Sequence, residues 1–132
     1  MLRTQSIEEF ATHLHGVYGF RVKGEISSKD LEDMAERMNQ VFDRMDKVDM
    51  LVSFENDEGA ELGAGLNVEV IKAQFRALTS VRNYCVAYAP ESAKSLIEFF
   101  DNILPVKARA FGSEHNALEH LRAQEPLTKK AA

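Results

Sequence analysis

The sequence predicts a single α/β domain with a mixed, mostly parallel five-stranded sheet, an antiparallel first edge strand and four helices. Two apolar runs, residues 48–54 and 83–89, have the pattern of strands that are buried on both faces, as central parallel strands are. Amphipathic stretches of helical period alternate with these runs, which indicates right-handed crossovers between parallel strands. The length of 132 residues fits one domain.

The chain is expected to open with a hairpin. Residues 8–15 alternate weakly between apolar and polar side chains, Gly16 makes a turn, and residues 18–22 alternate through a second strand that ends at Gly24. Because the connection is short, the two strands are predicted to pair antiparallel, with the first at the edge of the sheet.

The helix that follows is the clearest element in the sequence, and Ser27 and Ser28 offer N-caps for it. Its apolar residues keep the i, i+3, i+4, i+7 spacing for about four turns. They are Leu31, Met34, Ala35, Met38, Val41, Phe42 and Met45. Since this stripe must cover the central strand over residues 48–54, we expect Phe42 and Val52 to be buried together.

The rest of the chain continues the alternation. The expected elements are a helix from Leu66 to about Thr79, a strand over 83–89 stopped by Pro90, a helix capped by Ser92 and closed by Pro105, an edge strand over 106–111, and a helix begun by Gly112 and Ser113. Residues 1–124 are therefore predicted to form the domain. Residues 125–132 show no periodicity and are expected to be a disordered tail.

Composition and charge exclude several classes of function. The net charge of −5 argues against a nucleic-acid binder and against electrostatic binding to anionic lipid. No run approaches the roughly 18 apolar residues of a membrane span, and the start of the chain lacks the apolar core of a signal peptide. The single cysteine excludes an internal disulfide framework. We therefore expect a cytoplasmic protein with no membrane span.

The first place to look for function is the acidic, glycine-rich segment after the central strand, because contacts cluster at the carboxyl ends of parallel strands. The candidate residues are Glu55, Asn56, Asp57, Glu58, Gly59, Glu61, Gly63 and Gly65. The carboxylates match no EF-hand spacing and are interpreted as partners of a helix dipole. The glycines match neither a P-loop nor a dinucleotide fingerprint, so we expect no metal and no cofactor.

The remaining reactive residues form no catalytic set. His13 and His15 share a face of the predicted first strand but lack a third ligand nearby. Cys85 lies mid-strand among apolar neighbours and is interpreted as a small buried residue. No Ser-His-Asp arrangement or pair of carboxylates in separate environments is visible, so the sequence predicts a protein that is not an enzyme.

The second face of the predicted sheet has a small, apolar centre and basic rims. The candidate contacts on it are Arg21, Leu51, Ser53, Cys85 and Arg109. The opposite, inward face is expected to carry the larger apolar side chains, including Tyr88. If helices mostly cover the inward face, the second face must meet a protein partner, a second copy in a homodimer or an amphipathic ligand. A closely packed helix is the alternative.

Three stretches carry a resemblance to a known family: residues 18–26 leading into a helix, the strand over 50–54, and residues 106–111 followed by 117–121. In this order of elements, the chain resembles the STAS superfamily of anti-sigma-factor antagonists and transporter-tail domains over about residues 16–121. It is more similar to the small bacterial branch called SpoIIAA-like. The resemblance implies a STAS-like fold and a non-enzymatic regulatory or protein-interaction module. The alternative is a carrier of a small amphipathic or lipid-like ligand.

The chain departs from that superfamily at its switch. The better-known antagonists are controlled by phosphorylation of a serine in an Asp-Ser-x-Gly segment after the third strand. Here residues 54–59 read Phe-Glu-Asn-Asp-Glu-Gly, with no hydroxyl side chain between Ser53 and Thr79. The tryptophans often seen in the closer branch are also missing, and His120 stands where the second is expected. The sequence therefore predicts a module without the phosphoserine switch.

Overall fold

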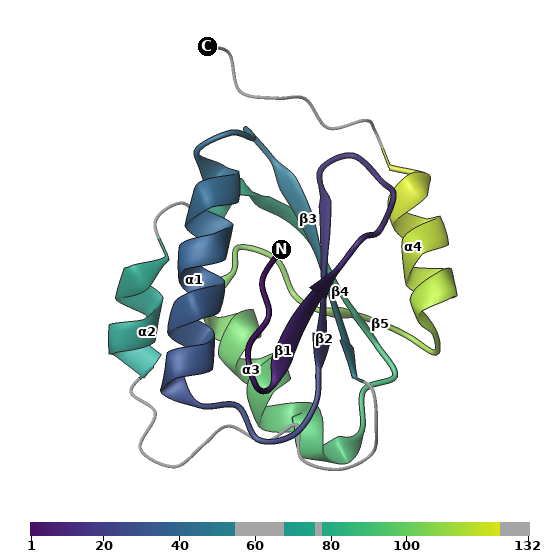
Figure 1. Ribbon diagram of the computed structural model, residues 1–132. Helices are drawn as coiled ribbons and strands as arrows, with labels where there is room; N and C mark the ends of the chain where they lie inside the picture. The colour runs from purple at the N-terminus through teal and green to yellow at the C-terminus, as the bar shows by residue number, and fades with distance from the viewer. Residues whose placement is uncertain (55–67, 76–77, 125–132) are drawn as a thin grey trace.

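The computed structural model describes residues 1–54, 68–75 and 78–124. Within them, one sheet runs in the order β1-β2-β3-β4-β5, with β1 antiparallel to β2 and the other pairs parallel (Figure 1). The strands are β1 (Ile7–Phe10), β2 (Val17–Val22), β3 (Val48–Phe54), β4 (Val81–Ala87) and β5 (Arg109–Phe111). The predicted fold class is confirmed.

The helices are α1 (Ser28–Phe42), α2 (Val68–Gln74), α3 (Lys94–Ile103) and α4 (Glu114–Arg122). Two of the predicted caps are correct: Ser27 accepts a hydrogen bond from the Asp30 amide at 3.1 Å, and Ser113 accepts one from the Asn116 amide at 3.0 Å. The prediction that Ser92 caps the third helix is wrong. A 3-10 turn over Glu91–Ala93 precedes α3, and the cap position, Ala93, offers no side-chain bond.

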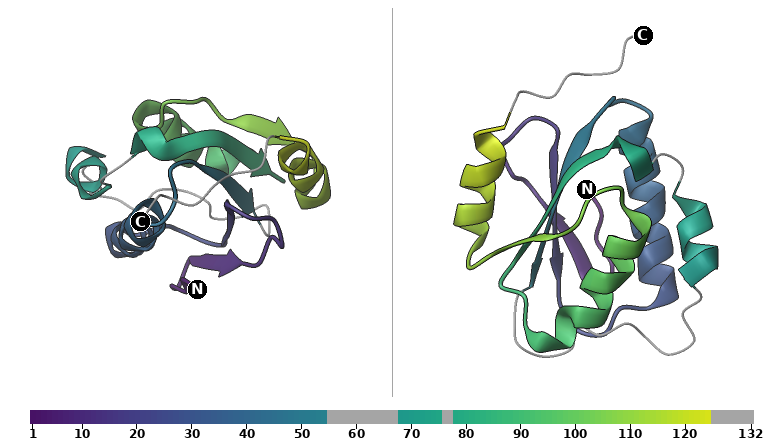
Figure 2. Two further views of the ribbon diagram at one scale, coloured as in Figure 1. Left: turned by 90° about the horizontal axis from the view of Figure 1, so that it is seen from above. Right: turned by 180° about the vertical axis from the view of Figure 1, so that it is seen from behind.

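The strand order determines which face each helix covers. Because the order never reverses, successive right-handed crossovers carry α1, α2 and α3 to the same face of the sheet. Helix α4 follows the last strand and is not a crossover, so it is free to cover the other face. Figures 1 and 2 show α4 standing apart from the other three helices, across the sheet.

The larger core lies between α1, α3 and the first face of the sheet, the inward one. Phe20, Val22, Met50, Val52, Phe54, Tyr84 and Val86 form its sheet side. Phe42 and Val52 are both buried in this core, at 2% and 1% exposure, as the helical stripe predicts. Burial of a side chain of this kind contributes about 1.5–3 kcal/mol, so the first face supplies most of the hydrophobic stabilisation.

Helix α4 closes the second face. Ala117 and Leu121 of α4 pack on Leu51, Cys85 and Ala87, all of which are buried. The small side chains at the centre of this face let the helix approach closely. Of the outcomes left open for this face, the closely packed helix is the one found: α4 covers Leu51 of β3 and Cys85 and Ala87 of β4.

Several predicted boundaries are wrong for reasons of tertiary structure. The first strand ends at Phe10, because the Thr12 hydroxyl bonds to the Val17 carbonyl at 2.8 Å and His13 turns into the left-handed region with φ 60°. His13 and His15 therefore share no strand face. The last strand is shorter than 106–111, because the Ala108 amide donates to a carboxylate oxygen of Asp101 at 2.8 Å instead of pairing with β4.

Two further elements differ in extent from the prediction. Among the described residues the second helix covers Val68–Gln74, where the sequence predicts a helix from Leu66 to about Thr79. The strand predicted over 83–89 is β4, which starts at Val81 and ends at Ala87. Its end is set by Tyr88, which leaves extended backbone for the left-handed region with φ 57°.

Candidate functional site

A polar cluster of Arg21, Ser53 and Glu114 lies on the second face, at the carboxyl ends of β2 and β3. Arg21 donates from Nε to Glu114 Oε2 and from Nη2 to Oε1, each at 3.0 Å. The Ser53 hydroxyl donates to Glu114 Oε2 at 2.6 Å. The guanidinium of Arg21 also lies 4.2 Å from the centre of the Phe10 ring. The cluster joins the sheet, α4 and the edge strand β1.

The fold brings these three residues together by register. Arg21 and Ser53 are paired positions in the parallel β2–β3 ladder, so their side chains share a face. Glu114 is the first residue of α4, where a carboxylate also complements the helix dipole. The hydrogen bonds from Arg21 hold the pKa of Glu114 below its usual range, against the opposing effect of burial. A carboxylate stabilised in this way is a poor general base for Ser53, so the cluster is a structural tie.

A second cluster lies at the amino ends of β3 and β4. Asp49 is completely buried, and its carboxylate accepts hydrogen bonds from Arg82 at 3.2 and 3.0 Å and from the Asn83 amide at 3.0 Å. The register between β3 and β4 shifts at this point, between Val48 and Asp49. Since a buried carboxylate must be paired, Arg82 and Asn83 compensate Asp49 and leave no charge to act on a substrate.

The structure separates the five candidate residues predicted for the second face. Arg21 and Ser53 meet in the first cluster, while Leu51 serves only packing beneath α4. Cys85 and Arg109 are paired positions of β4 and β5. Cys85 is buried, whereas the side chain of Arg109 is exposed. The eight candidates in the acidic segment, from Glu55 to Gly65, lie outside the described residues.

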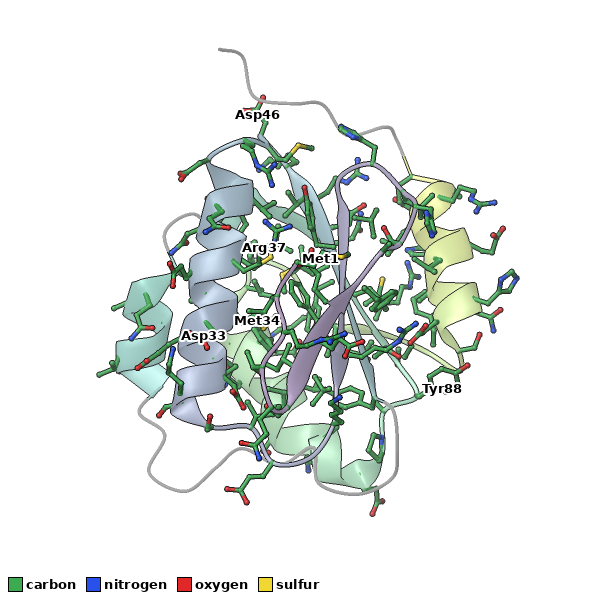
Figure 3. All side chains as sticks on the ribbon, viewed as in Figure 1. Met1, Asp33, Met34, Arg37, Asp46 and Tyr88 are labelled. Carbon is green, nitrogen blue, oxygen red and sulfur yellow. The ribbon has the colours of Figure 1, made fainter. Side chains whose placement is uncertain are left out.

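The sequence did not single out Tyr88, which it placed on the inward face. The residue directly follows β4 with a φ of 57° and is 52% exposed. Its amide donates to the Phe111 carbonyl at 3.3 Å, which holds the backbone in place at the end of the sheet. Figure 3 shows Tyr88 at the outside of the molecule. A sequence signal was present: an aromatic residue two positions before Pro90, where the strand pattern breaks.

A groove of about 670 Å³ begins one residue beyond Tyr88. It is lined by Ala89, Pro90, Glu91, Lys94, Ile97 and Glu98. Its apolar members are Ala89 and Pro90, from the segment that follows β4, and the partly buried Ile97 of α3. Within the described ranges, no group of three or more metal-ligating side chains is found, and no helix is long and apolar enough to cross a membrane.

The SpoIIAA-like family matches residues 17–122, which is more than half of the chain and runs from β2 to the end of α4. A search of curated protein sequences finds no significant match. The family indicates a regulatory module of the antagonist-like kind, generally without enzymatic activity. The match, the mixed five-stranded sheet and the four helices agree, and the chain belongs to the SpoIIAA-like family.

Proposed function

We propose that the protein is a cytoplasmic, non-enzymatic regulatory module that binds another protein through the carboxyl end of its sheet, around Tyr88. The observation that carries this proposal is the conformation of Tyr88: a large side chain, 52% exposed, on a backbone with φ 57°. Because α4 covers the second face, a partner protein at this end is favoured over a second copy bound through that face.

The backbone conformation of Tyr88 has a free-energy cost that the fold alone does not explain. A bulky residue in the left-handed region costs about 1–2 kcal/mol relative to ordinary backbone conformations. Because the ring is exposed, hydrophobic burial offsets little of this free-energy cost. Glycine or asparagine would fit the same backbone with less strain. An exposed aromatic held in this way is explained by contact with a partner, since tyrosine is among the residues that dominate binding energy at interfaces.

The groove beside Tyr88 has the composition of an interface. Its lining combines the apolar residues Ala89, Pro90 and Ile97 with the charged residues Glu91, Lys94 and Glu98. Protein interfaces likewise combine apolar and charged side chains. A side chain of a partner bound in this groove would bury the apolar surface of Ile97 and Pro90.

The acidic segment after β3 is proposed to contribute to the same surface. It begins directly after Phe54, and the carboxyl ends of β3 and β4 are neighbours in the sheet. The contributing residues are Glu55, Asn56, Asp57, Glu58, Gly59, Glu61, Gly63 and Gly65. We propose that its fixed carboxylates act without a phosphoserine switch. Asp57→Asn combined with Glu58→Gln should then weaken partner binding without changing the melting temperature.

A photo-cross-linking amino acid in place of Tyr88 tests the proposed surface in living cells. We expect one discrete protein adduct from position 88. The matched control places the same amino acid at His15, which is exposed at the other end of the sheet and should give no such adduct. Position 88 giving the same diffuse products as position 15 would refute the proposed surface. Phosphate found stoichiometrically on Ser27, Ser53 or Ser92 would refute the absence of a serine switch.

A further inference from the structure

A cleft of about 290 Å³ opens beside the amino half of β4, between this strand, the segment that leads into β5, and α4. It is lined by Arg82, Asn83, Tyr84, Cys85, Val106, Lys107, Ala108, Arg109 and His120. We propose that this cleft binds the phosphate group of a small molecule. The site is separate from the proposed protein-binding surface and does not depend on it.

The cleft exists because β4 and β5 pair over only three positions. The ladder joins Cys85, Val86 and Ala87 of β4 to residues 109–111. Before Arg109 the chain diverges, since the Ala108 amide is bound by the carboxylate of Asp101. The gap lies beside the amino half of β4. His120, in the last turn of α4, covers it from the second face, with its ring 5.2 Å from the ring of Phe111.

The lining is positively charged and in part uncompensated. The side chain of Arg109 is exposed and forms no hydrogen bond or ion pair with any residue of the described part of the chain. Lys107 donates one long bond, 3.4 Å, to the main-chain oxygen of Asp101. The ring nitrogens of His120 add a hydrogen-bonding group. In a protein with a net charge of −5, this concentration of basic groups in one cleft calls for a ligand.

Among the residues that the structure describes, no acidic side chain lines the cleft, and the two acids behind the lining are already bound. The carboxylate of Asp49 is held by Arg82 and Asn83, and that of Asp101 accepts the Ala108 amide. Neither is therefore positioned to neutralise Arg109. The positive charge of the cleft is carried by Lys107 and Arg109.

The geometry selects the class of ligand. A guanidinium presents a planar fork of donors that matches two oxygens of a phosphate, and an ammonium adds a mobile point charge. The volume lies at the lower end of the roughly 300–1,000 Å³ typical of small-molecule sites, which suits a small phosphate ester. The ring of His120, which lies 5.2 Å from the ring of Phe111, offers a planar surface for the organic part.

Titration of the full chain with glycerol 3-phosphate, followed by amide NMR at constant ionic strength, tests the site. We expect saturable shifts confined to residues 82–85, 107–109 and 120, and no shifts with glycerol. Arg109→Gln should weaken binding about tenfold or more, as loss of a charge-assisted bond does. The affinity of Arg109→Lys should lie between the affinities of wild type and Arg109→Gln. The matched control is Arg3→Gln, which removes the same charge from an exposed arginine beside the β1 edge and should bind like wild type.

A parallel titration with inorganic phosphate identifies what is recognised. Tighter binding of glycerol 3-phosphate means that the organic part contributes, and equal binding means that the phosphate group is sufficient. Both results support the site. Shifts that never saturate, or equal affinities for Arg109→Gln and Arg3→Gln, would overturn it. Because Arg109 is exposed, both glutamine variants should melt like wild type. If Arg109→Gln melts at a lower temperature than wild type, lost stability would explain its weaker binding. The test is then whether Arg109→Lys binds glycerol 3-phosphate more weakly than wild type does.

Discussion

Arg21 and Glu114, 93 positions apart in the chain, form a two-pronged ion pair with both nitrogen–oxygen distances at 3.0 Å. The pair fixes the amino-terminal end of α4 to β2. Ser53 adds a third hydrogen bond from β3 to the same carboxylate. This contact adds to the packing of Ala117 and Leu121 in holding the helix on the second face.

Replacing Glu114 with glutamine should destabilise the protein by about 1–2 kcal/mol at neutral pH, because two charge-assisted bonds are weakened in a partly exposed site. The pKa of Glu114 is lowered from its ordinary value of 4.5, first by the hydrogen bonds from Arg21. A lowered pKa means that the stabilisation is complete above about pH 4.5 and is lost as the pH falls further.

Urea unfolding at pH 7 and pH 3 measures this difference. We expect the gap between wild type and Glu114→Gln to be large at pH 7 and to shrink at pH 3. Glu119→Gln is the control, because Glu119 lies on the same helix in an exposed pair with Arg122. An equal gap at both pH values would show that Glu114 stabilises by its shape and not by its charge.

Substitutions at Gly19 and Phe10 should have strongly non-additive effects on the free energy of unfolding. A Cβ atom built on Gly19 would lie 2.5 Å from the tip of the Phe10 ring, so Gly19→Ala must displace the ring and its contact with Arg21. We expect Gly19→Ala to cost about 1–3 kcal/mol in the free energy of unfolding, as overpacking does. In a Phe10→Ala background the same change should be neutral or favourable, because alanine is better than glycine within a strand. A double-mutant cycle by urea unfolding gives the coupling, and simple additivity would contradict it.

The thiol of Cys85 should react slowly in the native protein. Burial, followed by the charge of Asp49, raises its pKa from 9.0 to about 11, while Arg109 acts in the opposite direction. At pH 8 the thiolate is then about a hundredfold rarer than in an ordinary cysteine. Labelling with iodoacetamide should be correspondingly slow and should accelerate towards pH 11. Arg109→Gln should slow it further. Equal rates for native and urea-unfolded protein at pH 8 would contradict the burial of this thiol.

The parts of the fold that were predictable are those that depend on local pattern. The caps at Ser27 and Ser113 follow from a bond within one helical turn, and the stripe that buries Phe42 follows from helical period. The true extent of β5 could not be predicted in this way, because the Ala108 amide donates to Asp101, which lies on a different element, α3. The face covered by α4 could not be predicted from the alternation of elements, because α4 follows the last strand and the crossover rule does not apply to it.

The candidate site was predictable to a similar degree. Arg21 and Ser53 share a face because strands have a period of two, and the register then pairs them. Glu114 could not be assigned to the cluster from the sequence, since nothing local relates it to residues so distant in the chain. Tyr88 was placed inward because an unbroken alternation was assumed through Ala89. The positive φ that turns it outward is a property of the folded backbone.

The backbone at Tyr88 yields the prediction that best separates function from stability. Tyr88→Asn removes an exposed ring and supplies a residue that tolerates the left-handed region. We therefore expect Tyr88→Asn to leave the free energy of unfolding unchanged or to raise it by up to about 1 kcal/mol. Tyr88→Phe keeps the ring and the strain and should behave like wild type. Thermal and urea unfolding of the three proteins measure the effect.

A partner-binding residue should show opposite effects in the two assays. If Tyr88 serves recognition, Tyr88→Asn should lose partner binding while keeping or gaining stability, the trade-off expected where function maintains a strained conformation. Tyr88→Phe should keep both. A fall of more than about 1 kcal/mol for Tyr88→Asn would instead mean that the ring supports the end of the sheet, as a packing side chain does when it is lost. The strain would then have a structural explanation, and the contact surface would have to be sought elsewhere at this end of the molecule.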